Sequence, residues 1–190
     1  MKKCSVLLTS AALAMCAGCL GPAPKVPKMW LVETKVTAVK STEEPRYGAV
    51  RLVRLTVRAP YDRPALAVLR NDGSIAFDPA NSFAATPAAM LKGTALDVIT
   101  STGIFPLAVE HASSAATKNS LEIAVTQFAL DCRTQGLRTA SVAVKVMLLE
   151  GHNVVAVAEG DGETLAKDGD YSAAFSTAFT SALVQALKKL

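Results

Sequence analysis

LEIAVTQFALDC at residues 121–132, followed by TASVAVKVMLL at residues 139–149, is the part of the chain that decides the fold. In the second segment apolar side chains occupy alternate positions from Val142 to Leu148, which is the period of a half-buried strand. In the first segment the apolar positions change phase near Thr126-Gln127. One extra residue there restores a common face, so we expect a β-bulge. The two segments therefore predict two long consecutive strands.

Further strands are expected on both sides of this pair. In residues 50–59, Val53, Leu55 and Val57 alternate with polar residues, which predicts that these three side chains share one face of a half-buried strand. Asn71-Asp72-Gly73 favours the positive φ angles of a tight hairpin turn. Besides the two long strands, the sheet is expected to contain strands at residues 30–39, 50–59, 65–70, 74–78, 105–110 and 154–164.

Two main helices are expected, one in the middle of the chain and one at its end. Thr86 and Pro87 are typical of a helix start, and Gly103 is typical of a helix end. The second helix is expected to begin at a cap formed by Asp168 or Asp170 and to continue to the last residue. Strands mixed with two helices predict an α/β fold.

The N-terminal residues have the layout of a bacterial secretory signal. Lys2 and Lys3 precede a short apolar run, and the segment closes on Ala17-Gly18-Cys19. This sequence resembles a lipobox, in which the cysteine thiol receives a diacylglyceryl group and becomes the new N-terminus. We therefore expect lipidation of Cys19, with the mature chain held at a membrane surface by its acyl chains.

Cys16 is the alternative lipidation site. It follows Met15, which is large for the residue before a cleavage point, whereas Cys19 follows a glycine. We expect residues 1–18 to be the signal peptide and residues 19–28, with three prolines, to be an extended tether. A domain over residues 29–190 follows.

Charge and composition argue against several classes of function. Loss of residues 1–18 removes Lys2 and Lys3 and no acid, so the net charge falls from +4 to +2, which predicts no nucleic-acid partner. Cys132 then remains as a lone thiol, expected to be a small buried hydrophobe and not a nucleophile. The sequence lacks the common hydrolase, phosphate-loop and zinc motifs, and His111 and His152 are expected at the surface. We expect no enzyme activity, no cofactor and no metal.

Two polar clusters each allow two interpretations. The arginines Arg51, Arg54 and Arg58 form either a stripe for lipid head groups or an ordinary polar strand face. The second cluster is a run of carboxylates that either binds a divalent cation or forms a solvated strand end and a helix cap: Glu159, Asp161, Glu163, Asp168 and Asp170. We favour the polar face for the first cluster and the solvated strand end for the second.

Local sequences over about three quarters of the chain, from Val50 to Leu190, resemble the ABC-type transport auxiliary lipoproteins, the PqiC-like family. Phe83 stands where that family usually has tryptophan. The similarity is carried by Pro60-Tyr61-Asp62-Arg63-Pro64, Leu69-Arg70, Phe83 with Thr86-Pro87, Leu96, Ser101-Thr102-Gly103, Phe105, Leu121-Glu122-Ile123, Gln127-Phe128 and Ala140-Ser141-Val142-Ala143-Val144 before an Ala-rich helix.

The resemblance implies a three-layer α/β fold with a mixed sheet and two main helices, like anticodon-binding and TolB N-terminal domains. It implies a non-enzymatic lipoprotein at the periplasmic face of the outer membrane, serving an ABC transporter and its MCE-family periplasmic partner in lipid transport. Leu20, directly after the acylated cysteine, agrees with outer-membrane sorting. Candidate partner contacts are Tyr61, Arg63, Arg70 and Phe83, because exposed residues of these types anchor interfaces.

Two other functions stay open at this point. One is an envelope-assembly lipoprotein, akin to components of lipopolysaccharide insertion or to TolB. The other is a periplasmic hydrolase, which would require an acid–base pair in a deep pocket. A homo-oligomer is compatible with each of the three functions.

Overall fold

A computed structural model describes residues 26–33 and 44–190 of the chain. The lipidation sites considered above, Cys16 and Cys19, lie outside these residues. In chain order the elements are β1 (Lys28–Trp30), β2 (Val50–Val57), β3 (Ala65–Leu69), β4 (Ile75–Phe83), α2 (Pro87–Ser101), β5 (Ala108–Glu110), β6 (Asn119–Asp131), β7 (Thr139–Glu150), β8 (Asn153–Leu165), the 3-10 turn η2 (Lys167–Gly169) and α3 (Tyr171–Lys188).

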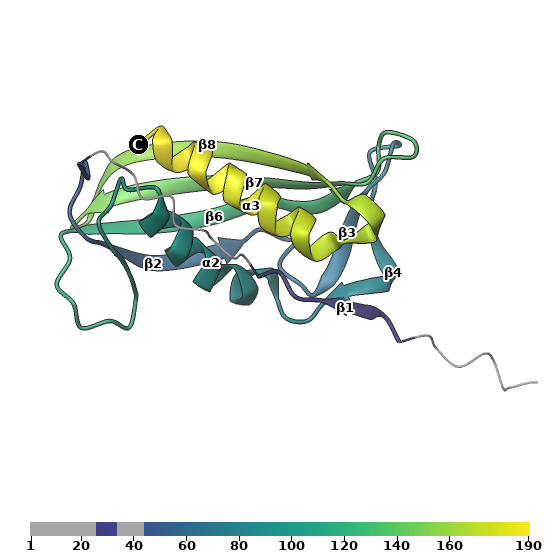
Figure 1. Cartoon of the computed structure of the whole chain (residues 1–190), viewed down its shortest axis with the longest axis horizontal. Helices are drawn as coiled ribbons and strands as arrows, with labels where there is room; N and C mark the ends of the chain where they lie inside the picture. Colours follow the sequence, from purple (N-terminus) through teal and green to yellow (C-terminus); the bar gives the residue numbers. More distant parts are fainter. Residues whose placement is uncertain (1–25, 34–43) are drawn as a thin grey trace, which may run out of the picture.

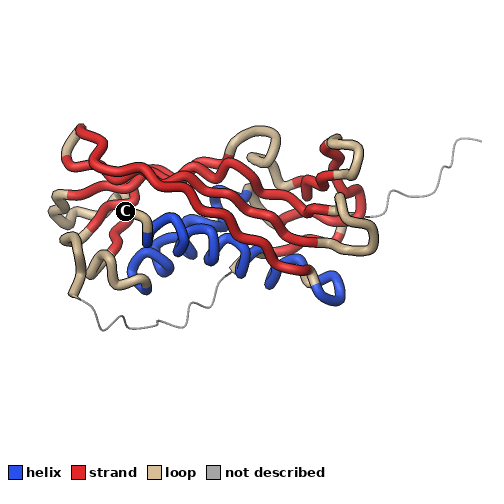
Figure 2. The backbone as a smooth tube through the Cα atoms, turned by 90° about the horizontal axis from the view of Figure 1, so that it is seen from above, coloured by secondary structure: helices blue, strands red, loops and turns tan. Residues whose placement is uncertain are grey.

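The mixed α/β fold with two main helices is confirmed (Figure 1). The strands form one eight-stranded sheet, and both helices lie against the same face of it (Figure 2). The described residues thus form one layer of strands and one of helices, where the resemblance implied three layers. Within the described residues, neither helix has the length and hydropathy needed to cross a membrane.

β6 is the centre of the sheet. One of its edges pairs antiparallel with β7 along its whole length, and β7 pairs antiparallel with β8. Its other edge is shared by two parallel strands, β2 along the first half and β3 at the end, where Leu69 lies opposite Asp131. β5 extends the sheet beyond β2, whereas β4 and then β1 extend it beyond β3. The sheet therefore forks along β6.

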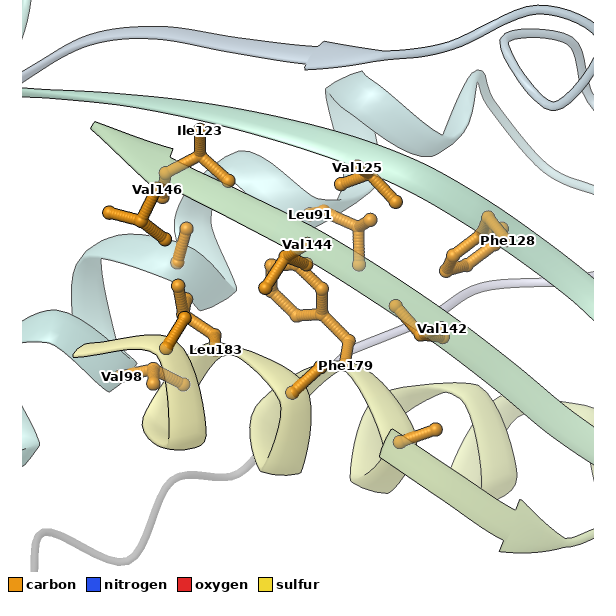
Figure 3. Close-up of a cluster of buried hydrophobic side chains, with 14 of the residues drawn as sticks. Leu91, Val98, Ile123, Val125, Phe128, Val142, Val144, Val146, Phe179 and Leu183 are labelled. Carbon is orange, nitrogen blue, oxygen red and sulfur yellow. The ribbon is translucent and has the colours of Figure 1, made fainter. Parts of the chain in front are cut away.

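The predicted bulge in the central strand is confirmed. The register between β6 and β7 shifts between Val125 and Gln127, and the Thr126 hydroxyl donates a hydrogen bond to the Ala143 carbonyl at 3.3 Å. The shift places the apolar side chains of both halves of β6 on the helix-covered face. Figure 3 shows them meeting side chains of β7, α2 and α3: Leu91, Val98, Ile123, Val125, Phe128, Val142, Val144, Val146, Phe179 and Leu183.

α3 lies unusually close to β8 because two positions of this strand have no side chain. A Cβ atom at Gly162 would be 2.0 Å from the Ala178 carbonyl oxygen, and one at Gly160 would be 2.1 Å from the Ala182 carbonyl oxygen. The helix is therefore seated on the bare backbone of the strand. Its N-cap is Asp170, whose carboxylate accepts a hydrogen bond from the Ala173 amide, so of the two predicted caps Asp170 is the one used.

The first predicted strand, residues 30–39, is wrong in its described part. β1 covers Lys28–Trp30, residues 31–33 form no strand, and residues 34–39 lie outside the described part of the chain. Val32 is completely buried, and the neighbouring carbonyl groups of Leu31 and Glu33 accept hydrogen bonds from the hydroxyls of two serines on α3. The backbone after β1 is thus bonded to side chains of α3 and not to a neighbouring strand.

Two other boundaries differ from expectation. In β2 the register shifts between Leu52 and Arg54, so Leu52 is buried and Val53 is only half-buried. The shift explains why Val53 does not share the core face with Leu55 and Val57. The strand predicted at residues 105–110 is reduced to Ala108–Glu110, and Phe105, ahead of it, is fully buried in the core.

Candidate functional site

The chain enters the fold at β1, and a network of side chains fixes this entry point. Lys28 to Trp30 pair in parallel with Asn81 to Phe83 at the end of β4. The Trp30 indole donates a hydrogen bond of 2.9 Å to the Asn81 side chain, and the Lys28 ammonium lies 3.9 Å above the Trp30 ring. The Asn81 amide is in turn held by the Asp78 carboxylate at 3.0 Å. The chain is therefore held against β4 from β1 onwards, directly after the predicted tether.

The same network continues into α3 and into the loop between β6 and β7. The rings of Trp30 and Tyr171 meet edge to face at 5.3 Å, and Tyr171 is buried at the first position of α3. Its hydroxyl accepts a hydrogen bond of 2.7 Å from Arg138, just before β7. The entry point of the chain is thus connected to the N-terminus of the last helix.

Two loops lie side by side at this end of the sheet. The β3–β4 turn is closed by Gly73, with φ of 81°, and the β6–β7 loop contains Gly136, with φ of 78°. They are neighbours because β3 and β6 pair up to Leu69 and Asp131, and the Cys132 amide then donates a hydrogen bond of 3.0 Å to the Leu69 carbonyl. Figure 1 shows both loops at the end of the sheet where the chain enters, together with β1 and the start of α3.

A shallow, open depression of about 510 Å³ lies between these two loops. Two of its lining side chains are guanidinium groups, and no carboxylate is among them. Arg133 is bound to Asp131 through its Nε at 2.9 Å and its Nη2 at 2.5 Å, whereas Arg70 makes no side-chain hydrogen bond or ion pair within the described residues. The lining residues, which we call the two-loop depression, are Arg70, Asn71, Cys132, Arg133, Gln135 and Gly136.

The Cys132 thiol belongs to this depression but has the wrong electrostatics for a nucleophile. Burial raises the pKa of the thiol above its usual value of 9.0, and Asp131 acts in the same direction. The positive charge of Arg138 opposes this shift without reversing it. Cys132 is half-buried against the core, where full burial was expected. A thiol with a raised pKa is largely protonated at neutral pH, which favours a packing role over a nucleophilic one.

The four predicted contact residues divide between surface and core. Arg63 and Arg70 are exposed, and the Arg63 guanidinium lies 5.0 Å from the centre of the Phe77 ring. Tyr61 is half-buried against the edge of the core. Phe83 is only 2% exposed, with its ring 5.2 Å from that of Phe128, so the expectation of an exposed anchor is wrong.

The position of Phe83 has a simple cause. It is the last residue of β4, and the hydrogen bond of 2.7 Å from its amide to the Pro64 carbonyl turns its ring towards α3, where it also meets Phe175 at 5.3 Å. An exposed aromatic was expected because phenylalanine is a type that anchors interfaces, and the polar and small residues around it, NSFAAT, gave no sign of its burial.

The basic stripe for lipid head groups is not formed. Arg51 donates hydrogen bonds to carbonyl oxygens of the loop after β5, including that of Ser113 at 2.7 Å, and Arg54 pairs with Glu122 at 2.6 Å. Two of the three arginines therefore hold the polar face of the sheet, which was the interpretation we favoured. Both histidines, His111 and His152, lie exposed in turns, as expected.

The carboxylate run serves the edge of the sheet and the start of α3. Glu159, Asp161 and Glu163 are exposed on β8, and Glu159 lies 3.5 Å from the Lys145 ammonium. Among residues 26–33 and 44–190, no three His, Cys, Asp or Glu side chains lie close enough together to hold a metal ion. The solvated strand end and the helix cap account for these acids.

Sequence reasoning missed several members of the entry network and the two-loop depression. Trp30 has an apolar neighbour on each side and gave no sign of its bond to Asn81, which lies 51 positions further along. Arg133 follows a predicted strand and resembles any loop arginine. Only the parallel pairing of β3 with β6, between residues about 60 positions apart, brings Arg133 next to Arg70.

Comparison with known proteins identifies the fold and no more. No protein-family model and no curated protein matches the sequence. A crystal structure of a Xanthomonas campestris protein of the family DUF330 superposes with a TM-score of 0.58 at 18% identity, over 86% of this chain and 89% of that one. An uncharacterised protein superposes with a TM-score of 0.53 at 13% identity, over 77% and 88% of the two chains.

A more distant similarity is to the PelC dodecamer of Paraburkholderia phytofirmans. Its TM-score is 0.46 at 16% identity, over 77% of this chain and 89% of that one. At such identities the comparison establishes a shared fold with the DUF330 protein, and no activity or assembly is carried over from PelC.

Proposed function

We propose that this chain is a lipoprotein of the bacterial envelope, anchored through Cys19, that acts as a non-enzymatic auxiliary subunit of an ABC/MCE-type lipid transport system. The lipobox-like sequence and the family resemblance support this proposal, and the shared fold with the DUF330 protein is compatible with it. The observation that supports the anchoring is the entry point of the chain. β1 begins only nine positions after Cys19 and is fixed through Trp30 to both Asn81 and Tyr171.

This arrangement gives the anchored domain a defined reach. Nine extended residues span about 30 Å, so the end of the sheet that carries β1 stays within that distance of the membrane. β7 has 12 residues and runs away from this end, which adds about 40 Å. The β7–β8 turn and the start of β6, where Glu150 pairs with Asn119, therefore lie at the end of the domain away from β1.

The anchoring is tested by mass analysis of the mature N-terminus. The wild-type chain should lose residues 1–18 and carry a diacylglyceryl group and an acyl chain on Cys19. Cys19→Ala should abolish both changes, and Cys16→Ala, the matched control, should leave them intact. A mature chain that starts at Cys16, or one without acyl chains, contradicts the proposal.

The partner is tested by cross-linking in cells and recovery of the anchored chain. We expect an MCE-family protein and its ABC transporter among the cross-linked partners, and Arg63→Glu to reduce their recovery more than Lys92→Glu on α2 does. Recovery of a β-barrel without any MCE protein would favour the envelope-assembly alternative. The mass of the cross-linked species also tells whether several copies of this chain assemble together.

A further inference from the structure

We propose that the two-loop depression binds the phosphate of an anionic phospholipid in the membrane that anchors the chain. This inference rests on the proposed anchoring and extends it, because it assigns a second, non-covalent contact to the bilayer. The site consists of the guanidinium groups of Arg70 and Arg133, which face the same open depression of about 510 Å³.

The donors at this site match a phosphate group. Arginine presents a planar set of N–H donors that can bind two oxygens of one phosphate at once. No hydrogen bond or ion pair within the described residues engages the Arg70 guanidinium, although its charge helps to lower the pKa of the Asp72 carboxyl in the neighbouring turn. Arg133 engages Asp131 through Nε and Nη2, and its Nη1 makes no hydrogen bond within the described residues. The Asp131 pair fixes the orientation of Arg133 and leaves donors for a ligand.

The surroundings of the depression are those of a surface that meets lipid. Leu137, in the β6–β7 loop, is 48% exposed, and Ile75, directly after the β3–β4 turn, is 41% exposed. Ile75 lies opposite Leu69 on the neighbouring strand. Apolar side chains beside guanidinium groups suit the boundary between head groups and acyl chains.

The tether brings this surface to a bilayer. The chain enters the fold at Lys28, at the same end of the sheet as the two loops (Figure 1). With about 30 Å of extended tether between Cys19 and Lys28, the depression can reach the head groups of the same membrane. Covalent anchoring raises the effective concentration of lipid at the site, so the binding measured for the unanchored chain is strengthened in the anchored one.

The experiment uses residues 20–190 without the acyl group, which keeps every described residue, and measures sedimentation with vesicles. Phosphatidylcholine vesicles are compared with vesicles that also contain phosphatidylglycerol. We expect binding only to the anionic vesicles, and loss of it at high salt, because a basic residue acts within a Debye length of a charged surface. Circular dichroism establishes that each variant is folded.

Charge-matched variants locate the site. Arg70→Gln and Arg133→Gln should each weaken binding about fivefold, the effect of one basic residue near an anionic surface. Arg58→Gln removes the same charge from an exposed arginine at the end of β2, outside the depression, and should have a much smaller effect.

Several results would overturn the inference. One is equal binding to both kinds of vesicle, and another is an Arg58→Gln variant that weakens binding as much as Arg70→Gln does. A third is a chain that binds inorganic phosphate in the depression but does not sediment with anionic vesicles. This result would show that the site binds a free anion and not a lipid. Leu137→Ser separates the two sources, since it should weaken vesicle binding and leave phosphate binding unchanged.

The phosphate site and the proposed anchoring are tested by separate measurements, so either one can be rejected without the other. Mass analysis of the mature N-terminus measures acylation of Cys19 and does not depend on Arg70 or Arg133. Vesicle sedimentation of the unacylated chain measures the depression and does not depend on Cys19. An acylated chain without phospholipid binding would leave the anchoring intact and reject the phosphate site.

Discussion

The contact between α3 and β8 makes Gly162→Ala the substitution with the most clearly defined consequence. A Cβ atom at this position would lie 2.0 Å from the Ala178 carbonyl oxygen and 2.9 Å from the Ala182 amide nitrogen. Both are backbone atoms of α3, so no side chain can rotate away to make room. To reach the 3.4 Å at which ordinary contact begins, the helix must move away from the strand by about 1.4 Å.

Such a displacement costs stability in two ways. Insertion of a methyl group into a filled core typically costs about 1–3 kcal/mol. A moving α3 would also withdraw Phe175, Phe179 and Leu183, which are fully buried against the sheet, and leave gaps around them. We therefore expect the free energy of unfolding to fall by about 3 kcal/mol, which lowers the melting temperature of a domain of this size by about 6–12 °C.

The assay is thermal and urea denaturation followed by circular dichroism, with Gly93→Ala as the matched control. Gly93 is exposed in α2, and a Cβ atom there would meet no other atom within 4 Å. Alanine should stabilise that helix by about 0.5–1 kcal/mol, because glycine is a poor helix residue. If Gly162→Ala melts with the wild type while Gly93→Ala shows its gain, the proposed backbone contact between α3 and β8 is refuted.

Three further experiments test the N-cap of α3, the Cys132 thiol and the Asp131–Arg133 ion pair. Asp170→Ala removes the hydrogen bond to the Ala173 amide and should lower the free energy of unfolding in urea by about 1 kcal/mol, and an unchanged urea midpoint would contradict the cap. Because burial raises the pKa of the Cys132 thiol, iodoacetamide should alkylate the native chain at pH 8 much more slowly than the chain in guanidinium, and equal rates would argue for a reactive thiol. The hydrogen bond from Arg133 lowers the pKa of the Asp131 carboxyl below 3.8, so Asp131→Asn should have a lower free energy of unfolding than the wild type at neutral pH. This difference should disappear as the pH falls through the lowered pKa. A difference that persists in acid would rule out the ion pair as its cause.

Much of the sheet could be predicted because its signals are local. The phase change at Thr126-Gln127 is a direct consequence of the two-residue period of a strand, and the bulge lies at that position. Asn71-Asp72-Gly73 forms the expected turn for an equally local reason, since Gly73 supplies the positive φ. Features that are determined within a few residues can be predicted from the sequence.

The candidate site could not be predicted because it depends on pairings between distant segments. Arg70 was selected from the sequence as a partner contact, but its neighbour Arg133 was not. The two meet through the parallel register of β3 and β6, which no local pattern specifies. Phe83 was misjudged for a similar reason. Its local sequence is typical of a loop, but its ring is buried against those of Phe128 and Phe175, which lie far away in the sequence.

The attachment of the tether depends on the close packing of α3 on β8. β1 has only three residues paired with β4, and so short an edge strand resists a pull on the chain poorly. The Leu31 carbonyl accepts a hydrogen bond from the Ser172 hydroxyl, and Trp30 contacts Tyr171, so a force on the tether is carried into the first turn of α3. Because α3 is seated on the backbone of β8 at Gly160 and Gly162, that force is passed to the main core of the domain. A chain held at a membrane by its N-terminus can therefore depend on an anchor point made of three residues.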